Sequence, residues 1–570
     1  MSGHLVTGVG PRPGLAIIGY QGTGSCRRGK LLCGCRVNGR PEREAGCGLR
    51  ATGSESTQYS EPSSLLTRIA ARGSVSLCTR MKSRLRFWNW RVAANWFDNL
   101  TRFFPHSTSL NGSESGRGHF APLGSSPLPD PKSQGTNSAG KQKGRTMNPL
   151  IHFKKTRILL LFIALPIGTL SHADVITDWN TAALNTIRAS RTAPPIASRS
   201  LAILHISIYD AANGIARTNE PYLVQSLAPS GASREAAASA AAHKALVNLF
   251  PAAASNFDTL HAAILAAIPN GPQKIAGIVW GEFVANQILA ARASDGSNAI
   301  VSPPGGSGPG VWVPTPPAFA LYLLPQWGFV VPFAMSSSSQ FRPPGPPSLD
   351  SQRYAADYNE VKELGAAVGS TRTGEQSEIA LFWADGAGTE TPPGHWNSIA
   401  QTIAATEGNT LEENARLFAL LNIAMADAAI CAWDAKYTFH NWRPVTAIRN
   451  AETDGNPATD PDIAWNSFIV TPPFPDYVSG HSTFSGAAAT VLPLFYGTED
   501  LPFTTGSDFL PGVTRSFSTC LDAAEEAAVS RIYGGIHFRF ASDDGLQAGI
   551  SIGEWTNSHY LQPKGNRSRR

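Results

Sequence analysis

The amino-acid sequence predicts an all-α protein. From Asp174 onward the chain is rich in Ala and Leu, apolar residues recur at helical spacing, and strand-like alternation of polar and apolar residues is rare. Pro194 and Pro251 stand at expected helix starts, where a missing N–H costs nothing. We expect helices over residues 175–189, 195–213, 232–249, 253–268, 272–293, 352–367, 374–384, 394–406, 411–437, 481–495, 518–533 and 541–558.

Residues 1–146 differ from the rest of the chain. They carry 21 Lys and Arg against 7 Asp and Glu, together with five of the seven Cys. They show no sustained apolar period. We interpret this stretch as a leader that is either not native or disordered. The alternative is a soluble basic domain followed by a buried apolar helix at 158–170.

Residues 147–173 have the order of parts that is typical of a signal peptide. Met147 is followed by three basic residues between positions 154 and 157, then by an apolar run at 158–170 and a small-residue cleavage site ending at Ala173. The run is too short for a membrane-spanning helix, which needs about 20 apolar residues. We therefore expect translation to start at Met147 and cleavage near Ala173. The mature chain would be periplasmic or secreted, with no integral membrane span.

The remaining chain, residues 174–570, is acidic. It has 23 Lys and Arg against 35 Asp and Glu, so the positive net charge of the whole chain comes from the leader. An acidic body argues against binding to nucleic acid or to anionic membranes. Two cysteines remain, Cys431 and Cys520. Export would permit a disulfide, but we expect two separate buried thiols.

A segment rich in Pro, Gly and Ser covers residues 302–348 and excludes long helices there. Its aromatic residues favour an ordered, packed loop over a flexible tether. The segment divides the chain into an N-terminal helical half at 174–301 and a C-terminal catalytic half at 349–570.

The first of three candidate site motifs runs from Lys436 to Arg443 and Pro444. A spacing of seven is two helical turns, so we expect both cations on one helix face, about 10 Å apart. Pro444 would end or bend that helix. Two cations on one face repel each other unless an anion lies between them. The alternative is a solvated face, or salt bridges to acids such as Asp434.

The second motif is Ser479-Gly480-His481. We expect Ser479 to cap a helix, whose first amides at Gly480 and His481 would point at a bound anion. An imidazole in this first turn suits proton transfer. The alternative is plain helix capping with a structural histidine.

The third motif contains Arg531 and His537, separated by Gly534-Gly535. The guanidinium offers a planar donor fork for an oxyanion, and a neutral imidazole can attack phosphorus or ligate a metal. The glycines would end the helix and bring His537 into the pocket. A structural Arg and a core His are the alternative. Together the three motifs predict a pocket for a tetrahedral or trigonal-bipyramidal oxyanion.

The three motifs resemble the signature of the family that joins vanadium-dependent haloperoxidases with type-2 phosphatidic acid phosphatases and bacterial acid phosphatases. That signature is Lys-x6-Arg-Pro, Pro-Ser-Gly-His and Ser-Arg-x5-His. The resemblance implies two four-helix-type bundles, with the oxyanion pocket at one end of the C-terminal bundle. It implies oxyanion-binding roles for Lys436, Arg443, Ser479, Gly480 and Arg531. It also implies acid/base catalysis by His481 and a bond from His537 to vanadium or phosphorus.

Further residues resemble the haloperoxidase side of the family. Asp385, in Phe382-Trp-Ala-Asp-Gly386, matches an Asp that supports the site through an ionic contact, and we count it with the catalytic residues. Trp433 and Phe474 look like haloperoxidase positions near the halide.

The sequence departs from the family pattern at two positions. Val478 replaces the Pro before Ser-Gly-His, and Ala541 stands where many relatives have an Asp that orients the last histidine. We expect Asp543, Asp544 or a backbone carbonyl to orient His537 in place of that Asp.

The resemblance implies an exported haloperoxidase-like enzyme that oxidises halide with hydrogen peroxide at a vanadate bound to His537. Phosphate would be an isosteric occupant, because vanadate has as its ground state the five-coordinate shape through which phosphoryl transfer passes. The alternative is an exported acid phosphatase that hydrolyses a phosphomonoester through a phosphohistidine. A non-catalytic helical binding protein is a third hypothesis. Family members are often dimers or larger, so a homo-oligomer is also implied.

Overall fold

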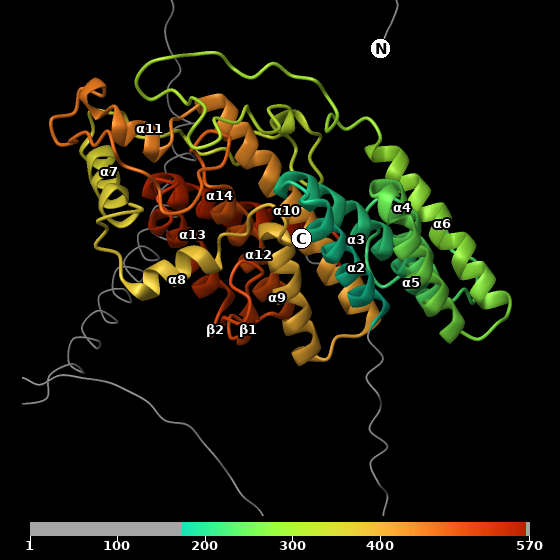
Figure 1. The fold of residues 1–570 in the computed structure, drawn as a ribbon. Helices are drawn as coiled ribbons and strands as arrows, with labels where there is room; N and C mark the ends of the chain where they lie inside the picture. The colour runs from blue at the N-terminus through green and yellow to red at the C-terminus, as the bar shows by residue number, and fades with distance from the viewer. Residues whose placement is uncertain (1–173, 566–570) are drawn as a thin grey trace, which may run out of the picture. The chain divides into compact units, whose positions relative to one another are not determined.

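The computed structural model describes residues 174–565. The predicted leader at 1–146 and the predicted signal peptide at 147–173 lie outside the described residues. Helices make up nearly all of the regular structure in the described part, where a single two-stranded sheet is the exception (Figure 1). The prediction of an all-α fold is therefore confirmed.

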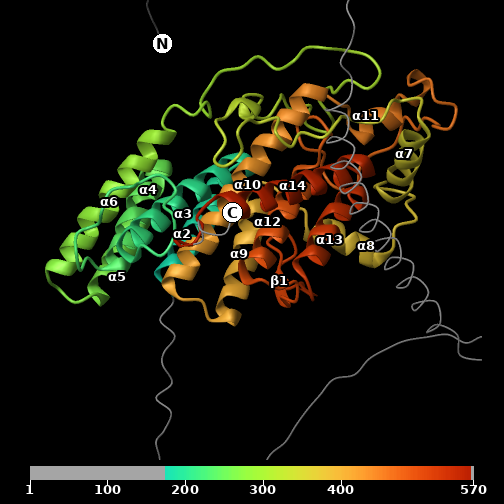
Figure 2. The same ribbon diagram turned by 180° about the vertical axis from the view of Figure 1, so that it is seen from behind.

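The helices before the Pro-rich segment form one group. They are α2 (Val175–Ser190), α3 (Pro194–Ala216), α4 (Arg234–Leu249), α5 (Ala254–Ala267) and α6 (Pro272–Arg292). Local signals begin them: the side chains of Asp174 and Ser233 accept backbone amides at the starts of α2 and α4, and Pro occupies the first turn of α3 and of α6. α4 packs against α3, α5 and α6, and Figures 1 and 2 both show α4, α5 and α6 together at one end of this part of the chain.

The helices after that segment form a second group. They are α7 (Gln352–Leu364), α8 (Gly374–Phe382), α9 (Thr391–Glu407), α10 (Leu411–Phe439), α11 (Pro444–Arg449), α12 (Gly480–Tyr496), α13 (Cys520–Tyr533) and α14 (Arg539–His559). Reciprocal side-chain to backbone bonds begin two of them, with Thr373 and Gln376 at α8 and Thr410 and Glu413 at α10. α12 packs on α10, α13 and α14, so it forms the centre of this group.

Helix α10 joins the two groups, because it packs on α3 from the first and on α12 and α14 from the second. It is the one helix in residues 174–565 that is long and apolar enough to cross a membrane, yet 94% of its most apolar window is buried inside the fold. A core position therefore accounts for its composition. The expected absence of a membrane span stays a prediction.

The Pro-rich segment at 302–348 forms no α-helix and contains one short 3-10 turn, η2 (Trp327–Phe329). Its end is fixed to α10 by the buried Asp427, which accepts the backbone amides of residues 333–335 at 2.6, 2.7 and 2.6 Å. The side chains of Trp312 and Trp327 are buried. This is the ordered packing that the aromatic residues predict.

Two small elements were not predicted. One is the antiparallel pair β1 (Phe503–Gly506) and β2 (Thr514–Phe517), and the other is α11. Each strand has 4 residues and α11 has 6, which is too short for a periodic pattern to show. The expectation of two buried free thiols is confirmed at Cys431 and Cys520.

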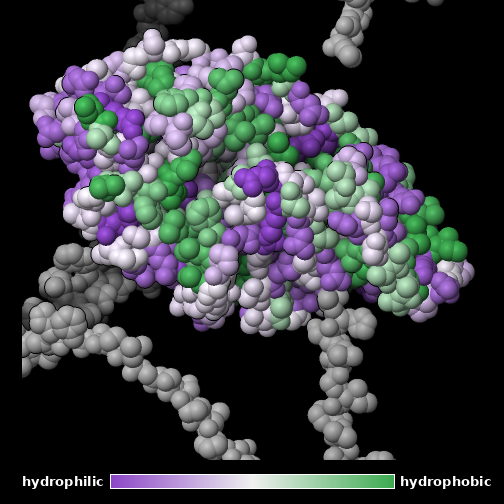
Figure 3. Space-filling model, viewed as in Figure 1, coloured by the Kyte–Doolittle hydropathy of each residue, from purple (hydrophilic) through white to green (hydrophobic). Residues whose placement is uncertain are grey.

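One face of α6 leaves apolar side chains exposed. Ile275, Val279 and Phe283 are spaced by four residues and therefore lie in one stripe along the helix. The space-filling view shows apolar surface over this helix (Figure 3). The stripe lies in the first helical group, away from the motifs that carry the candidate site.

Candidate active site

The basic side chains of the three motifs meet in the interior. Lys436 lies in the last turn of α10, Arg443 is the N-cap residue of α11, and Arg531 lies in the last turn of α13. Each is at most 2% exposed. Lys436 Nζ and Arg443 Cζ each lie 4.9 Å from the centroid of the Phe474 ring. Burial is the main cause that lowers the pKa of Lys436 and of Arg531, and the charge of Arg443 adds to both effects. The spatial convergence expected from the motifs is therefore present.

The expectation that Lys436 and Arg443 share a helix is wrong. α10 ends at Phe439, because His440 adopts a left-handed conformation with φ of 52° and closes the helix through its amide to the Lys436 carbonyl. Arg443 is extended, as the residue before a proline usually is, and Pro444 starts a new helix. The two cations are brought together by this break in the chain.

The ammonium of Lys436 is fully engaged by backbone. It donates to the carbonyls of Pro475 at 2.9 Å, Asp476 at 3.0 Å and Val478. All three N–H donors of the ammonium are therefore used. Lys436 contributes positive charge to the site and fixes the backbone segment that leads to Ser479. Burial, followed by the charge of Arg443, lowers its pKa well below the usual value.

Arg443 and His537 are in direct contact. Nη1 of Arg443 donates to Nε2 of His537 at 3.1 Å and to the Ile536 carbonyl at 2.6 Å, while its Nε donates to the Phe474 carbonyl at 2.8 Å. Burial and the charge of Arg443 hold the pKa of His537 well below 6.5, so the imidazole is neutral near pH 7. The turn before His537 requires glycine at position 535, because its φ is +75° and a Cβ there would collide with the Gly365 carbonyl.

Arg531 reaches the pocket from α13 and donates Nη1 to the Trp383 carbonyl at 2.6 Å. Burial lowers its pKa to about 9, and Asp385 acts in the opposite direction. Asp385 makes no ion pair with Arg531 within 4.0 Å in the described chain; its ion-pair partner is His395, with Nδ1 3.2 Å from Oδ2. The ionic contact implied for Asp385 is thus made to a histidine that the sequence did not single out.

His395 is itself buried. Its Nε2 lies 3.1 Å from the Thr505 hydroxyl, and its ring stacks on Trp383 with centroids 4.7 Å apart. Burial alone would lower its pKa, but Asp385 and Glu390 outweigh that effect and raise it. Trp383 both stacks on His395 and accepts from Arg531. The pair of Asp385 and His395 therefore lies next to the segment that binds Arg531.

The start of α12 supplies the second motif. Ser479 is the N-cap residue, as predicted: its side chain accepts the Ser482 amide at 3.3 Å. The first amides, at Gly480 and His481, precede any intrahelical acceptor and carry the positive end of the helix dipole. Burial and the charge of Arg531 keep the pKa of His481 well below 6.5, against a hydrogen bond to the Ala384 carbonyl. Its Nε2 is buried without a partner.

Asp476 is a site residue that sequence reasoning missed. Its Oδ1 lies 2.8 Å from His537 Nδ1, at ion-pair distance but without the alignment of a hydrogen bond. The carboxylate is fully buried, and burial raises its pKa to about 7 against the opposing effects of Arg443 and Lys436. The two candidates named for this task, Asp543 and Asp544, do not contact His537: Asp543 is exposed, and Asp544 accepts the Tyr477 hydroxyl at 2.8 Å.

Two aromatic rings lie beside the buried cations. Trp433 packs against Phe474 with centroids 5.0 Å apart, and the Phe474 ring centroid lies 4.9 Å from both Lys436 Nζ and Arg443 Cζ. The Pro-rich segment contacts one of them, because the Leu323 carbonyl accepts the indole N–H of Trp433 at 3.2 Å. Trp433 and Phe474 therefore lie beside the cations, and their place near a halide stays a prediction.

The donor set leaves positive charge and hydrogen-bonding capacity unmatched. The nearby buried Asp385 pairs with His395 and Asp476 lies against His537, so in the described chain no ion pair within 4.0 Å reaches Lys436, Arg443 or Arg531. Nη2 of Arg443 and Nε of Arg531 are buried and have no partner. Buried donors without partners cost about 1–3 kcal/mol each, more for charged groups. These atoms, the helix amides and the imidazole of His537 fit an oxyanion such as vanadate or phosphate.

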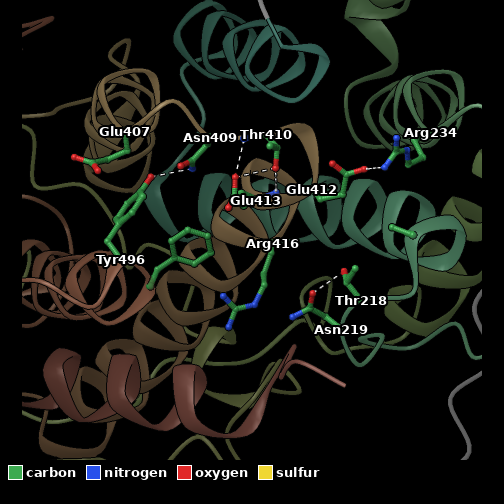
Figure 4. Close-up of a pocket in the computed structure, with 12 residues that line it drawn as sticks. Thr218, Asn219, Arg234, Glu407, Asn409, Thr410, Glu412, Glu413, Arg416 and Tyr496 are labelled. Carbon is green, nitrogen blue, oxygen red and sulfur yellow. Dashed lines mark hydrogen bonds and ion pairs between the residues drawn. The ribbon is translucent and has the colours of Figure 1, made fainter. Parts of the chain in front are cut away.

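A separate cavity of about 760 Å³ lies at the other end of α10 (Figure 4). Thr410 and Arg416 line it, and Arg416 stands 20 residues before Lys436, about 30 Å along the helix axis. Its charged groups are largely paired, Arg234 with Glu412 and Glu413 with the Thr410 cap. No residue of the candidate active site lines it.

Comparisons with known proteins agree with this arrangement. A family model described as the VCPO second helical-bundle domain matches residues 416–564. The vanadium chloroperoxidase of Curvularia inaequalis is 27% identical over 490 aligned residues, which cover 65% of this chain and 79% of that protein.

Solved structures give the same result for the fold. The crystal structure of a bacterial vanadium-dependent iodoperoxidase is similar with a TM-score of 0.61 and 27% identity, covering 68% of this chain and 97% of that one. A holo-type bacterial vanadium-dependent chloroperoxidase matches with a TM-score of 0.53 at 18% identity, covering 65% and 92% of the two chains. The second likeness is evidence of fold alone.

Proposed function

Because the chain belongs to the superfamily of vanadium-dependent haloperoxidases, we propose that it oxidises halide with hydrogen peroxide at a vanadate held in the pocket between α10, α12 and α13. The observation that carries the proposal is the set of buried donors without partners, Arg443 Nη2 and Arg531 Nε, around the neutral His537. Buried cations are costly unless a negative charge compensates them, so we expect this cluster to bind an anion.

The residues that would hold vanadate follow from the free donors. Arg443 and Arg531 would each present one free N–H, and the first amides of α12 would add the helix dipole. His537 would offer the lone pair of Nε2, which accepts from Nη1 of Arg443 at 3.1 Å in this structure, so Arg443 would have to release it when vanadate binds. When bound, vanadate would supply a Lewis-acidic centre that binds hydrogen peroxide and activates it to oxidise halide.

His481 is the group that moves a proton in this proposal. Its Nε2 is buried without a partner, and its pKa is kept well below 6.5, so it is a free base at neutral pH. A base placed beside the oxyanion takes the proton of incoming hydrogen peroxide and returns one to the leaving oxygen. Trp433 and Phe474 exclude water from the side where halide would approach.

The test is reconstitution of the purified protein with orthovanadate, followed by assay of iodide, bromide and chloride oxidation with hydrogen peroxide. Activity should depend on vanadate. The His481→Ala variant should still bind vanadate but lose about 10²-fold or more in turnover. Loaded protein that oxidises no halide would rule the proposal out.

The second candidate is acid phosphatase activity in the same pocket. The neutral His537 with its lone pair on Nε2 also suits attack on phosphorus, and a free His481 could protonate the leaving group. Hydrolysis of a phosphomonoester by vanadate-free protein, blocked by added vanadate, would favour this reaction.

Export remains part of the proposal and rests on the sequence of residues 147–173. N-terminal sequencing of protein recovered from the periplasm or medium should begin at Asp174. Recovery of a chain in the cytoplasm that starts before Ala173 would contradict it.

A further inference from the structure

The family resemblance places an Asp that orients the last histidine at position 541, where this chain has Ala541. Ala541, at the position where many relatives have the orienting Asp, is fully buried in the first turn of α14 and has no polar side-chain atom. Asp544 is bonded to Tyr477 and Asp543 is exposed. No carboxylate on α14 therefore reaches His537.

A carboxylate from another segment reaches the ring instead. Asp476 Oδ1 lies 2.8 Å from His537 Nδ1, and both side chains are at most 2% exposed. Asn441 fixes Asp476 by accepting its amide at 3.0 Å and donating to Oδ2 at 3.4 Å. Lys436 holds the carbonyls on both sides of it. Contacts with Asn441 and Lys436 therefore fix the position of Asp476.

The other ring nitrogen fixes the tautomer. Nε2 of His537 faces Nη1 of Arg443 at 3.1 Å, and a guanidinium can only donate. Nε2 must therefore carry the lone pair, which places the ring hydrogen on Nδ1. The carboxyl of Asp476 is the acceptor beside that hydrogen, and it has a lone pair to offer in either of its own protonation states.

We propose that Asp476 is the positioning residue for His537. Its Oδ1 lies 2.8 Å from Nδ1 and so favours the tautomer with the hydrogen on Nδ1, in place of a carboxylate at position 541. That tautomer leaves the lone pair on Nε2, where it faces Arg443 in this structure and would face the oxyanion once Arg443 releases it. The assignment rests on the proposed function in that both concern one pocket, and it applies equally to oxidation of halide and to phosphoryl transfer.

The experiment compares Asp476→Ala with Asp476→Asn. Both variants remove the negative charge, but only the Asn variant keeps an acceptor oxygen, so the pair isolates the contact to Nδ1. Nitrogen-15 NMR of histidine-labelled full-length protein, with the His537 signals assigned by their loss in His537→Gln, reports the tautomer. Calorimetric titration in phosphate-free buffer reports orthovanadate affinity.

Wild-type protein and D476N should show Nδ1–H at His537. In D476A only the contact with Arg443 still favours that tautomer, so D476A should show a larger share of Nε2–H and bind vanadate about tenfold more weakly than D476N. Equal tautomers and equal affinities in the two variants would overturn the assignment. If D476A does not fold, the wild-type spectrum decides alone, since Nε2–H at His537 is incompatible with the proposal. Neither readout needs turnover, so a protein without halide oxidation can still pass both.

Discussion

Replacing Arg531 with Lys should weaken oxyanion binding by one to two orders of magnitude. The guanidinium of Arg531 is 2% exposed, donates Nη1 to the Trp383 carbonyl at 2.6 Å and leaves Nε without a partner. A lysine ammonium keeps the charge, but it cannot bond that carbonyl and present a second donor to the pocket in the same planar geometry.

The magnitude follows from the donor that is lost. A hydrogen bond to a charged group contributes about 1.5–3 kcal/mol, and about 1.4 kcal/mol corresponds to a factor of ten in Kd. We therefore expect vanadate and phosphate to bind about 10- to 150-fold more weakly to R531K. Because the site is buried, this difference should change little between low and moderate salt.

Isothermal titration with orthovanadate, and separately with phosphate, measures the effect. Arg449→Lys is the matched control: Arg449 ends α11 and donates to the Trp465 carbonyl at 2.7 Å and to Asn466 Oδ1 at 2.6 Å, so it uses its donors outside the pocket. R449K should bind as the wild type does. An R531K affinity within twofold of wild type would refute the reasoning.

Two further predictions concern stability. Asp427→Asn should lower the free energy of unfolding by about 3 kcal/mol, because an amide group cannot accept all three amides of residues 333–335; urea denaturation that finds less than about 1 kcal/mol would contradict this. Burial raises the pKa of Asp357 to about 6, so its stabilising contribution is complete below about pH 4 and is lost as the pH rises through 6. Asp357→Asn, which keeps an acceptor for the Phe540 amide, should therefore gain stability relative to wild type between pH 4 and 7, by at most about 3 kcal/mol. Urea curves at both pH values measure this, and a difference that does not change with pH would argue against it.

The sequence was sufficient for the helices because their signals are local. Capping residues, prolines in first turns and apolar periodicity lie within each segment, and the expected helix at 411–437 differs from α10 only by the extension to Phe439. It was insufficient at the break between Lys436 and Arg443. There, the spacing of Lys436 and Arg443 still fits a helix, but His440 adopts a left-handed conformation that ends α10. Pro444 was the available signal, since it disfavours helix at the residue before it.

The site could be predicted only as far as its motifs extend. The cations, His481 and His537 stand in recognisable patterns, and the fold brings them together. Asp476 and His395 stand in no motif: Asp476 acts on His537, which is distant in sequence, and His395 acts on Asp385 across a separation of 10 residues. Such pairs are set by tertiary packing, and a single chain offers no local signal for them.

A crystal structure of the protein grown with orthovanadate tests the central claim most directly. The account predicts one oxyanion per chain, bonded to His537 Nε2 and within hydrogen-bond distance of Arg443 Nη2 and Arg531 Nε. A pocket that stays empty at saturating vanadate, or an anion bound away from these three atoms, would contradict it.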